Sequence, residues 1–179
     1  VPGAGSKVGY ALSSHPDVDM VSLTGSTKSG IAVAQAAATT IKRVTLELGG
    51  KSPNVLFEDA DIPMAVTKGV YNCFLNSGQT CIALSRMIVP AHKQKEIVEM
   101  AKSIVESMVM GDAFTDGVYL GPMVDDAQRQ SVREYIRAGI REGATLVTGG
   151  PETPENLPKG FFVKPTLFAD VKPDMTIAQ

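Results

Sequence analysis

The chain has two thiols, Cys73 and Cys81, and their surroundings differ. Cys73 falls on a stripe of apolar residues spaced three and four apart, which is typical of a helix face packed into a core. Cys81 lies off that stripe, after the Gly-Gln-Thr of residues 78–80, where the glycine allows a ligand to approach the backbone closely. Free N–H groups at a chain reversal can lower the pKa of a nearby thiol and so favour the nucleophilic thiolate. Cys81 is therefore either a nucleophile or a half-buried spectator.

A carboxylate is the candidate partner for this thiol. Glu47 lies in a run where polar residues alternate with Val44, Leu46 and Leu48, which predicts a strand with Glu47 on the face opposite the aliphatic side chains. A glutamate at a strand end, just before two glycines, can face a cleft and act as a general base when it is partly desolvated. The alternative is an exposed or ion-paired surface glutamate.

Histidine and metal chemistry have little support. His15 precedes a proline in a predicted loop, and His92 begins a charged helix, so both are expected to be solvated. No cysteine and histidine grouping has metal-ligand spacing, so no metal site is predicted.

The glycine-rich phrases of the chain match known phosphate-binding patterns only in part. The glycines at 3, 5 and 9 miss the dinucleotide fingerprint by one residue, and Thr45 occupies the position where a P-loop needs its first glycine. The phrase TGST, residues 24–27, ends a predicted strand and opens a predicted helix. Its free N–H groups and hydroxyls could bind a phosphate, or Ser26 could be an ordinary helix N-cap.

Short apolar runs alternate with helical patterns along the chain, which predicts the α/β class. Helices are expected over 5–14, 26–38, 61–76, 97–108 and 125–143. Strands are expected over 18–23, 44–48, 54–57, 86–89, 144–148 and 161–168. Asp61 and Asp125 are the predicted N-caps of two helices, and residues 149–159 form a predicted loop.

Composition excludes several classes of protein. Among 179 residues, 44% are hydrophobic and 20% are charged, and the net charge is −2 with no basic block. Nucleic acid and anionic membranes are therefore not expected partners. Two cysteines are too few for a disulfide framework, which favours a reducing, cytoplasmic compartment. The chain begins with Val1 in a turn-rich phrase, so we expect a piece of a longer protein.

The phrases ELGGKSP at 47–53 and GQTC at 78–81 together resemble the NAD(P)-dependent aldehyde dehydrogenase superfamily. The phrase TGST with Gly30, the glycines at 5 and 9, the Gly-Pro at 121–122 and FFVKPT at 161–166 extend the resemblance over essentially the whole chain. The fold that this implies is a Rossmann-type three-layer sheet with flanking helices, incomplete at both ends. Residues 1–48 would be the C-terminal part of the nucleotide-binding domain, and 49–179 would form most of the catalytic domain.

The resemblance also implies a role for each matching residue. Cys81 would be the nucleophile and Glu47 the general base. The residues implied in cofactor binding are Gly5, Gly9, Gly25, Ser26, Thr27, Gly30, Leu48 and Gly49. Leu23 departs from the phenylalanine that is usual before Thr-Gly-Ser. The oxyanion asparagine and the adenosine-ribose lysine would lie before Val1, and the nicotinamide-ribose glutamate after Gln179.

The implied reaction oxidises an aldehyde to a carboxylic acid with NAD or NADP, NAD being favoured, through a thiohemiacetal and a thioester on the cysteine. The implied partners are a small aldehyde and further copies of the parent protein, as a homodimer or homotetramer. Three alternatives remain open: an inactive structural or interaction module, a dehydrogenase that passes the acyl group to coenzyme A, and a cofactor-free thiol hydrolase.

Overall fold

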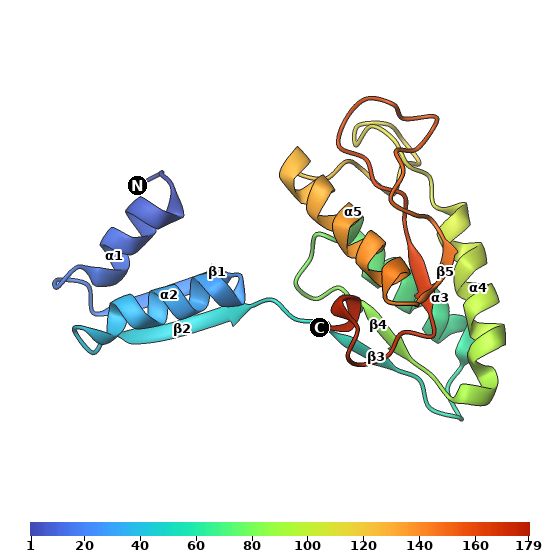
Figure 1. Ribbon diagram of the computed structural model, residues 1–179, viewed down its shortest axis with the longest axis horizontal. Coiled ribbons are helices and arrows are strands. Elements are labelled where there is room, and N and C mark those ends of the chain that lie inside the picture. Colours follow the sequence, from blue (N-terminus) through green and yellow to red (C-terminus); the bar gives the residue numbers. More distant parts are fainter. The chain divides into compact units, whose positions relative to one another are not determined.

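Helices alternate with six short strands, which confirms the α/β class predicted from the sequence. The computed structural model describes residues 1–179, which form two compact units, 1–50 and 51–179 (Figure 1). The strands pair into three separate two-stranded sheets. None of the helices combines the length and the apolar character that crossing a membrane requires.

The smaller unit is built around one strand–helix–strand crossover. Its elements are a π-helical turn η1 (Gly5–Gly9), α1 (Tyr10–Ser14), β1 (Met20–Gly25), α2 (Thr27–Ala38) and β2 (Arg43–Leu48). Strands β1 and β2 are parallel, and their register runs from Met20 opposite Arg43 to Gly25 opposite Leu48. Both strands therefore end at the same edge of this sheet.

Helix α2 packs closely on β2 because its facing residues are small. The predicted alternation is confirmed, since Val44, Leu46 and Leu48 are half-buried whereas Glu47 is exposed. A Cβ atom at Gly30 would lie 2.7 Å from Leu48 Cδ2, closer than real Cβ atoms approach other atoms. Gly30 therefore sets the spacing between α2 and the end of β2.

The larger unit contains two further sheets with helices packed beside them. Its elements are β3 (Pro53–Val55), α3 (Ile62–Phe74), a 3₁₀ turn η2 (Leu75–Gly78), β4 (Arg86–Ile88), η3 (Ala91–Lys93), α4 (Gln94–Ser107), α5 (Asp126–Arg141), β5 (Thr145–Thr148), β6 (Leu167–Ala169) and η4 (Thr176–Ala178). Strands β3 and β4 are parallel, whereas β5 and β6 are antiparallel.

The core of the larger unit lies between α3 and α4. The buried side chains on the two helices repeat at helical spacing, as the sequence pattern predicts, and flanking residues complete the core. The core residues are Leu56, Val66, Val70, Ile97, Ala101, Val105, Met108 and Leu120. The predicted N-caps are confirmed: Asp61 Oδ1 accepts from the Met64 N–H at 3.1 Å, and Asp125 Oδ1 accepts from the Gln128 N–H at 2.7 Å.

The prediction of a strand over 161–168 is wrong for most of that range, because β6 begins only at Leu167. Pro165 has no N–H to donate to a ladder. The Thr166 hydroxyl donates to Lys164 O at 2.8 Å and accepts from the Gly150 N–H at 3.1 Å. Phe161 O accepts from the Met123 N–H at 2.9 Å. The polar groups of this segment are therefore bonded to loops.

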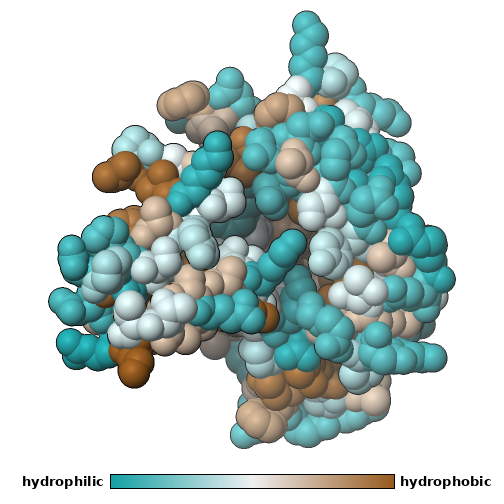
Figure 2. Space-filling model, turned by 60° about the vertical axis from the view of Figure 1, so that its left-hand side comes forward, coloured by the Kyte–Doolittle hydropathy of each residue, from teal (hydrophilic) through white to brown (hydrophobic).

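The surface is polar with scattered apolar residues. More of the face in Figure 2 is hydrophilic than hydrophobic, and the hydrophobic residues occur in separate groups. The most exposed large apolar side chains include Ile41, Phe57 and Phe114. Exposed apolar residues are normal on protein surfaces.

A pair of glycine substitutions tests the packing of the loop that replaces the expected strand. Gly149 (φ +89°) and Gly117 (φ +82°) both have positive φ of similar size, but only Gly149 is crowded, with a Cβ position 2.3 Å from Pro165 O. Gly117→Ala should cost about 1–2 kcal/mol from backbone strain alone. Gly149→Ala should cost roughly 2–5 kcal/mol, since overpacking is added to that strain. Urea unfolding of both variants measures the difference, and equal losses would contradict the crowding at Gly149.

Candidate active site

The chain reverses direction directly after α3. Three consecutive residues have left-handed backbone angles: Asn76 (φ 52°), Ser77 (φ 58°) and Gly78 (φ 76°). Two of the three are not glycine, so the turn is strained and depends on its surroundings to persist. It leads into residues 79–84, which carry Cys81, and we call residues 75–84 the thiol loop.

Hydrogen bonds inside the thiol loop close this turn. Asn76 O accepts from both the backbone N–H and the side-chain Nε2 of Gln79, each at 3.2 Å. Asn76 Nδ2 donates in return to Gln79 O at 3.3 Å. The Thr80 hydroxyl donates to Leu75 O at 3.1 Å. Gln79 and Thr80, the two residues before Cys81, are therefore bonded to Asn76 and Leu75 at the start of the loop.

Three further hydrogen bonds connect the thiol loop to neighbouring elements of the larger unit. Asn72 Oδ1, on α3, accepts from the Leu84 N–H at 3.1 Å. The Ser77 hydroxyl donates to Gly121 O at 2.9 Å. Gln79 Oε1 accepts from the Val124 N–H at 2.8 Å. These bonds fix the loop at both ends while Cys81 itself stays exposed.

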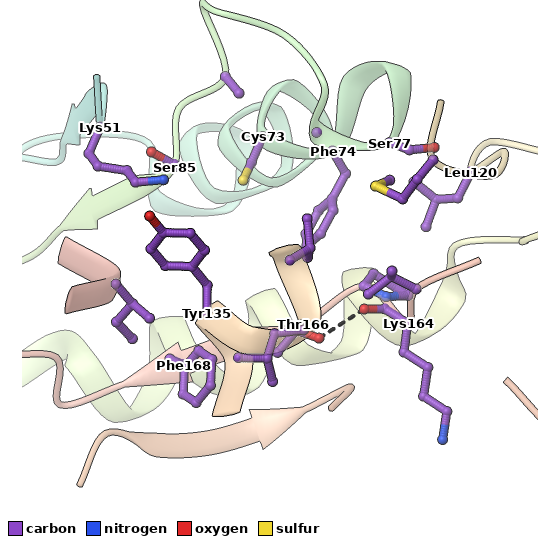
Figure 3. Close-up of a pocket in the computed structure, with 18 of the residues that line it drawn as sticks. Lys51, Cys73, Phe74, Ser77, Ser85, Leu120, Tyr135, Lys164, Thr166 and Phe168 are labelled. Carbon is purple, nitrogen blue, oxygen red and sulfur yellow. Dashed lines mark hydrogen bonds between the residues drawn. The ribbon is translucent and has the colours of Figure 1, made fainter. Parts of the chain in front are cut away.

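Cys73 differs from Cys81 in its surroundings. It is half-buried, so the expectation that it is packed in the core is only partly right. It lines a cavity of about 300 Å³ between α3, α5 and the 163–168 segment (Figure 3). Burial raises the pKa of the Cys73 thiol, and the nearby ammonium group of Lys51 partly opposes that rise.

Five of the candidate cofactor residues, Gly25, Ser26, Thr27, Leu48 and Gly49, lie at or directly after the carboxyl ends of β1 and β2 in the smaller unit. The register places Thr24 opposite Glu47 and Gly25 opposite Leu48, so β1 and β2 bring both phrases to their shared carboxyl ends. In parallel sheets this edge is the usual location of ligands. Gly25, Ser26, Thr27, Glu47 and Gly49 are exposed there, and Leu48 is half-buried.

Ser26 is the N-cap of α2, which is the ordinary role that the sequence left open. Its Oγ accepts from the Ser29 N–H at 3.2 Å and lies 3.0 Å from Ser29 Oγ. The first turn of the twelve-residue helix still presents N–H groups and the Thr27 hydroxyl at an exposed end. These are groups that bind phosphate at helix N-termini. Gly5 and Gly9 lie in η1, before α1, which packs against α2.

Several residues that shape the site had no role in the sequence predictions. Gln79 belongs to the GQTC phrase and Asn76 ends the helix predicted over 61–76, but neither position indicates a hydrogen-bond partner. The bond between Gln79 and Val124 joins residues 45 positions apart. The Asn-Ser-Gly of residues 76–78 is a signal for left-handed backbone, because asparagine and glycine tolerate that region best.

Comparison with known proteins identifies the family. The sequence profile described as the aldehyde dehydrogenase family matches residues 1–179. The chain belongs to the aldehyde dehydrogenase family. The resemblance found in the sequence is therefore confirmed.

Individual relatives match the whole chain. It is 45% identical over 179 residues to a 3-succinoylsemialdehyde-pyridine dehydrogenase from a Pseudomonas species, covering 100% of the chain and 38% of that relative. It is 44% identical over 180 residues to the mitochondrial aldehyde dehydrogenase of Rattus norvegicus, covering 100% of the chain and 34% of that relative. The chain thus spans between a third and two fifths of the length of these relatives.

Solved structures give the same result. A cysteine-to-alanine mutant of aldehyde dehydrogenase C from Pseudomonas syringae, in complex with NAD+ and octanal, has a TM-score of 0.98 and 47% identity, with 100% of this chain and 37% of that chain covered. Betaine aldehyde dehydrogenase from Staphylococcus aureus, in complex with NAD+, has a TM-score of 0.95 and 32% identity, with 100% and 36% covered.

The two thiols should differ in their rates of alkylation. Cys81 is exposed, whereas burial raises the pKa of Cys73, so less of Cys73 is thiolate at any pH below that raised value. We expect iodoacetamide at pH 8 to label Cys81 faster by about tenfold or more. Labelling of Cys73 should accelerate as the pH rises further.

Mass spectrometry of the full-length protein that contains this chain measures both rates. Cys81→Ala is the control, and it should leave only the slow labelling. Faster labelling at Cys73 would contradict the assignment of Cys81 as the reactive thiol.

Proposed function

We propose that this chain supplies the nucleophile and the general base of an NAD(P)-dependent aldehyde dehydrogenase that releases a free carboxylic acid. The observation that carries the proposal is an exposed cysteine, Cys81, on a strained loop that hydrogen bonds fix at both ends. Such an arrangement suits a nucleophile, because a small aldehyde can reach the sulfur while its position is restricted.

Cys81 attacks the aldehyde carbon as a thiolate. A C–S bond forms, and the carbonyl π electrons move to oxygen to give a thiohemiacetal oxyanion. A backbone N–H at Cys81 is a candidate donor to that oxyanion. Loss of hydride from the former aldehyde carbon restores the C=O bond and leaves a thioester on Cys81. Bound NAD or NADP supplies the hydride acceptor for this step.

Glu47 serves the second half of the reaction as general base. It removes a proton from water, the resulting hydroxide attacks the thioester carbon, and the C–S bond breaks to release the acid and the Cys81 thiolate. Its exposure at the carboxyl end of β2, just before two glycines, leaves the carboxylate accessible to water.

The N-terminus of α2 fits the role of a dinucleotide site. Gly25 and the exposed hydroxyls of Ser26 and Thr27 precede free helix N–H groups, which suit the pyrophosphate. Leu48 and Gly49 lie at the adjacent strand end, where we assign contacts near the nicotinamide. Gly5, Gly9 and Gly30 support this region through η1 and the packing of α2. Our proposal names NAD as the dinucleotide, supported by the NAD+ complexes of related enzymes.

The proposed division of labour assigns residues 1–48 to cofactor binding and 49–179 to thiol catalysis. Because the chain spans about 38% of the first relative, the full activity belongs to a protein of the relatives' length. We expect the 179-residue chain alone to be inactive, since aligning the reactants contributes roughly 7–11 kcal/mol.

Replacing the base should separate the two halves of the reaction. In the full-length protein, Glu47→Gln removes the proton acceptor but leaves the thiol and the cofactor residues, so the first hydride transfer should persist. Deacylation should slow by about 10²–10⁴-fold, the usual effect of losing a general base. Stopped-flow absorbance should show one burst of NAD(P)H per active site and then almost no turnover.

Glu58→Gln is a matched control, because Glu58 is an exposed glutamate that pairs with His92 and Lys93. It should turn over like the parent protein. Full turnover in Glu47→Gln would mean that another group activates water. A parent rate that depends on coenzyme A would replace hydrolysis with acyl transfer, and failure to bind NAD(P) would favour a structural module.

A charge change at the N-cap tests the pyrophosphate site. Ser26→Asp retains a good N-cap acceptor but adds a negative charge where phosphate is expected. The Kd for NAD should rise about tenfold or more, because like charges repel at short range. Ser26→Asn is the control, since it caps the helix equally well without charge. Isothermal titration measures both, and an equal Kd in the two variants would exclude Ser26 from the cofactor site.

A further inference from the structure

We infer, on the basis of the proposed function, that Gln79 is a positioning residue that fixes Cys81 against the segment 121–124. Gln79 does not touch substrate or cofactor in this role. It acts through the thiol loop, and its side-chain amide is the part that does so.

The amide of Gln79 bonds in two directions. Its Oε1 accepts from the Val124 N–H at 2.8 Å, outside the loop. Its Nε2 donates to Asn76 O at 3.2 Å, inside the loop. A single planar group therefore connects the left-handed turn to a neighbouring segment, with Cys81 only two residues further along the chain.

The inner bond supports a conformation that is costly by itself. Asn76 and Ser77 both have positive φ, and non-glycine residues keep this strained conformation only where neighbouring contacts compensate for it. Asn76 O receives its two bonds from the backbone and the side chain of Gln79. Removing the side chain takes away one of the two and loosens the turn.

The outer bond leads to an anchored segment. Met123, next to Val124, is buried, and its N–H donates to Phe161 O at 2.9 Å. The Arg129 guanidinium lies over the Phe161 ring, 5.7 Å from its centre. The 121–124 segment is therefore a fixed reference for the loop. The Ser77 hydroxyl also bonds to this segment, at Gly121 O. Gln79 lies two residues before Cys81 and Ser77 lies four before it, so the bond between Gln79 and Val124 is the nearer of the two to the thiol along the chain.

A change at Gln79 should alter the position of the Cys81 sulfur and leave its intrinsic reactivity unchanged. A misplacement of about 1 Å can lower a reaction rate by about 10²-fold, because attack on the aldehyde and hydride loss both need alignment. A small alkylating agent needs no such alignment. Loss of the Gln79 amide should therefore slow the aldehyde reaction far more than alkylation of Cys81.

Two substitutions in the full-length protein separate the two bonds. Gln79→Met keeps the length of the side chain but removes both bonds, and Gln79→Glu keeps an acceptor for the Val124 N–H while removing the donor to Asn76 O. Gln130→Met is the matched control, since Gln130 is an exposed glutamine on α5. Three quantities are measured: the burst rate constant for NADH, the rate of iodoacetamide labelling at Cys81, and hydrogen exchange in the peptide that contains Val124.

For Gln79→Met we expect a burst rate constant lower by about 10–100-fold and a labelling rate within about twofold of the parent. Exchange at Val124 should accelerate in Gln79→Met and remain slow in Gln79→Glu, whose burst rate should lie between those of Met and the parent. Gln130→Met should change none of the three.

Two results would overturn the inference. One is unchanged exchange at Val124 in Gln79→Met, which would show that the amide does not anchor the segment. The other is a smaller burst amplitude at an unchanged rate constant, which would mean that the variant only lowers the folded fraction. A burst that survives Cys81→Ala would instead refute the proposed function, and the exchange data would still decide the role of Gln79.

Discussion

The left-handed turn at residues 76–78 is the constraint on which the thiol site depends. It reverses the chain directly after α3, so the helix does not continue toward Cys81. Cys81 is therefore exposed. Because two of its three residues are not glycine, the turn requires compensating contacts. The hydrogen bonds of Gln79, Ser77 and Asn72 supply them, and they also determine where Cys81 lies.

The same reversal explains why two cysteines eight positions apart have different surroundings. Cys73 still belongs to α3 and faces a partly apolar cavity, where burial disfavours the thiolate and raises its pKa. Cys81 comes after the reversal and is exposed. A helix that continued through 76–78 would have given both thiols a helical environment, so the turn separates a structural thiol from an accessible one.

In the smaller unit the equivalent constraint is the parallel register of β1 and β2. It brings the TGST phrase and Glu47 to one edge although about twenty residues separate them in the sequence. Helix α2 supplies the crossover, and Gly30 lets it approach Leu48 closely enough for this edge to form. The proposed cofactor and base residues thus share an edge because of strand pairing.

The sequence by itself determined the class, the helix caps, the alternation of β2 and the family, because these follow from local periodicity, from side-chain caps and from motif spacing. It did not determine that residues 161–166 form a loop, since their strand-like composition says nothing of the bonds that Thr166 and Phe161 make to distant backbone. It also gave no role to Gln79, whose partner Val124 is 45 residues away. Only the tertiary structure decides such pairings, because a hydrogen bond between distant residues depends on how the intervening elements pack and leaves no periodic signal in the sequence.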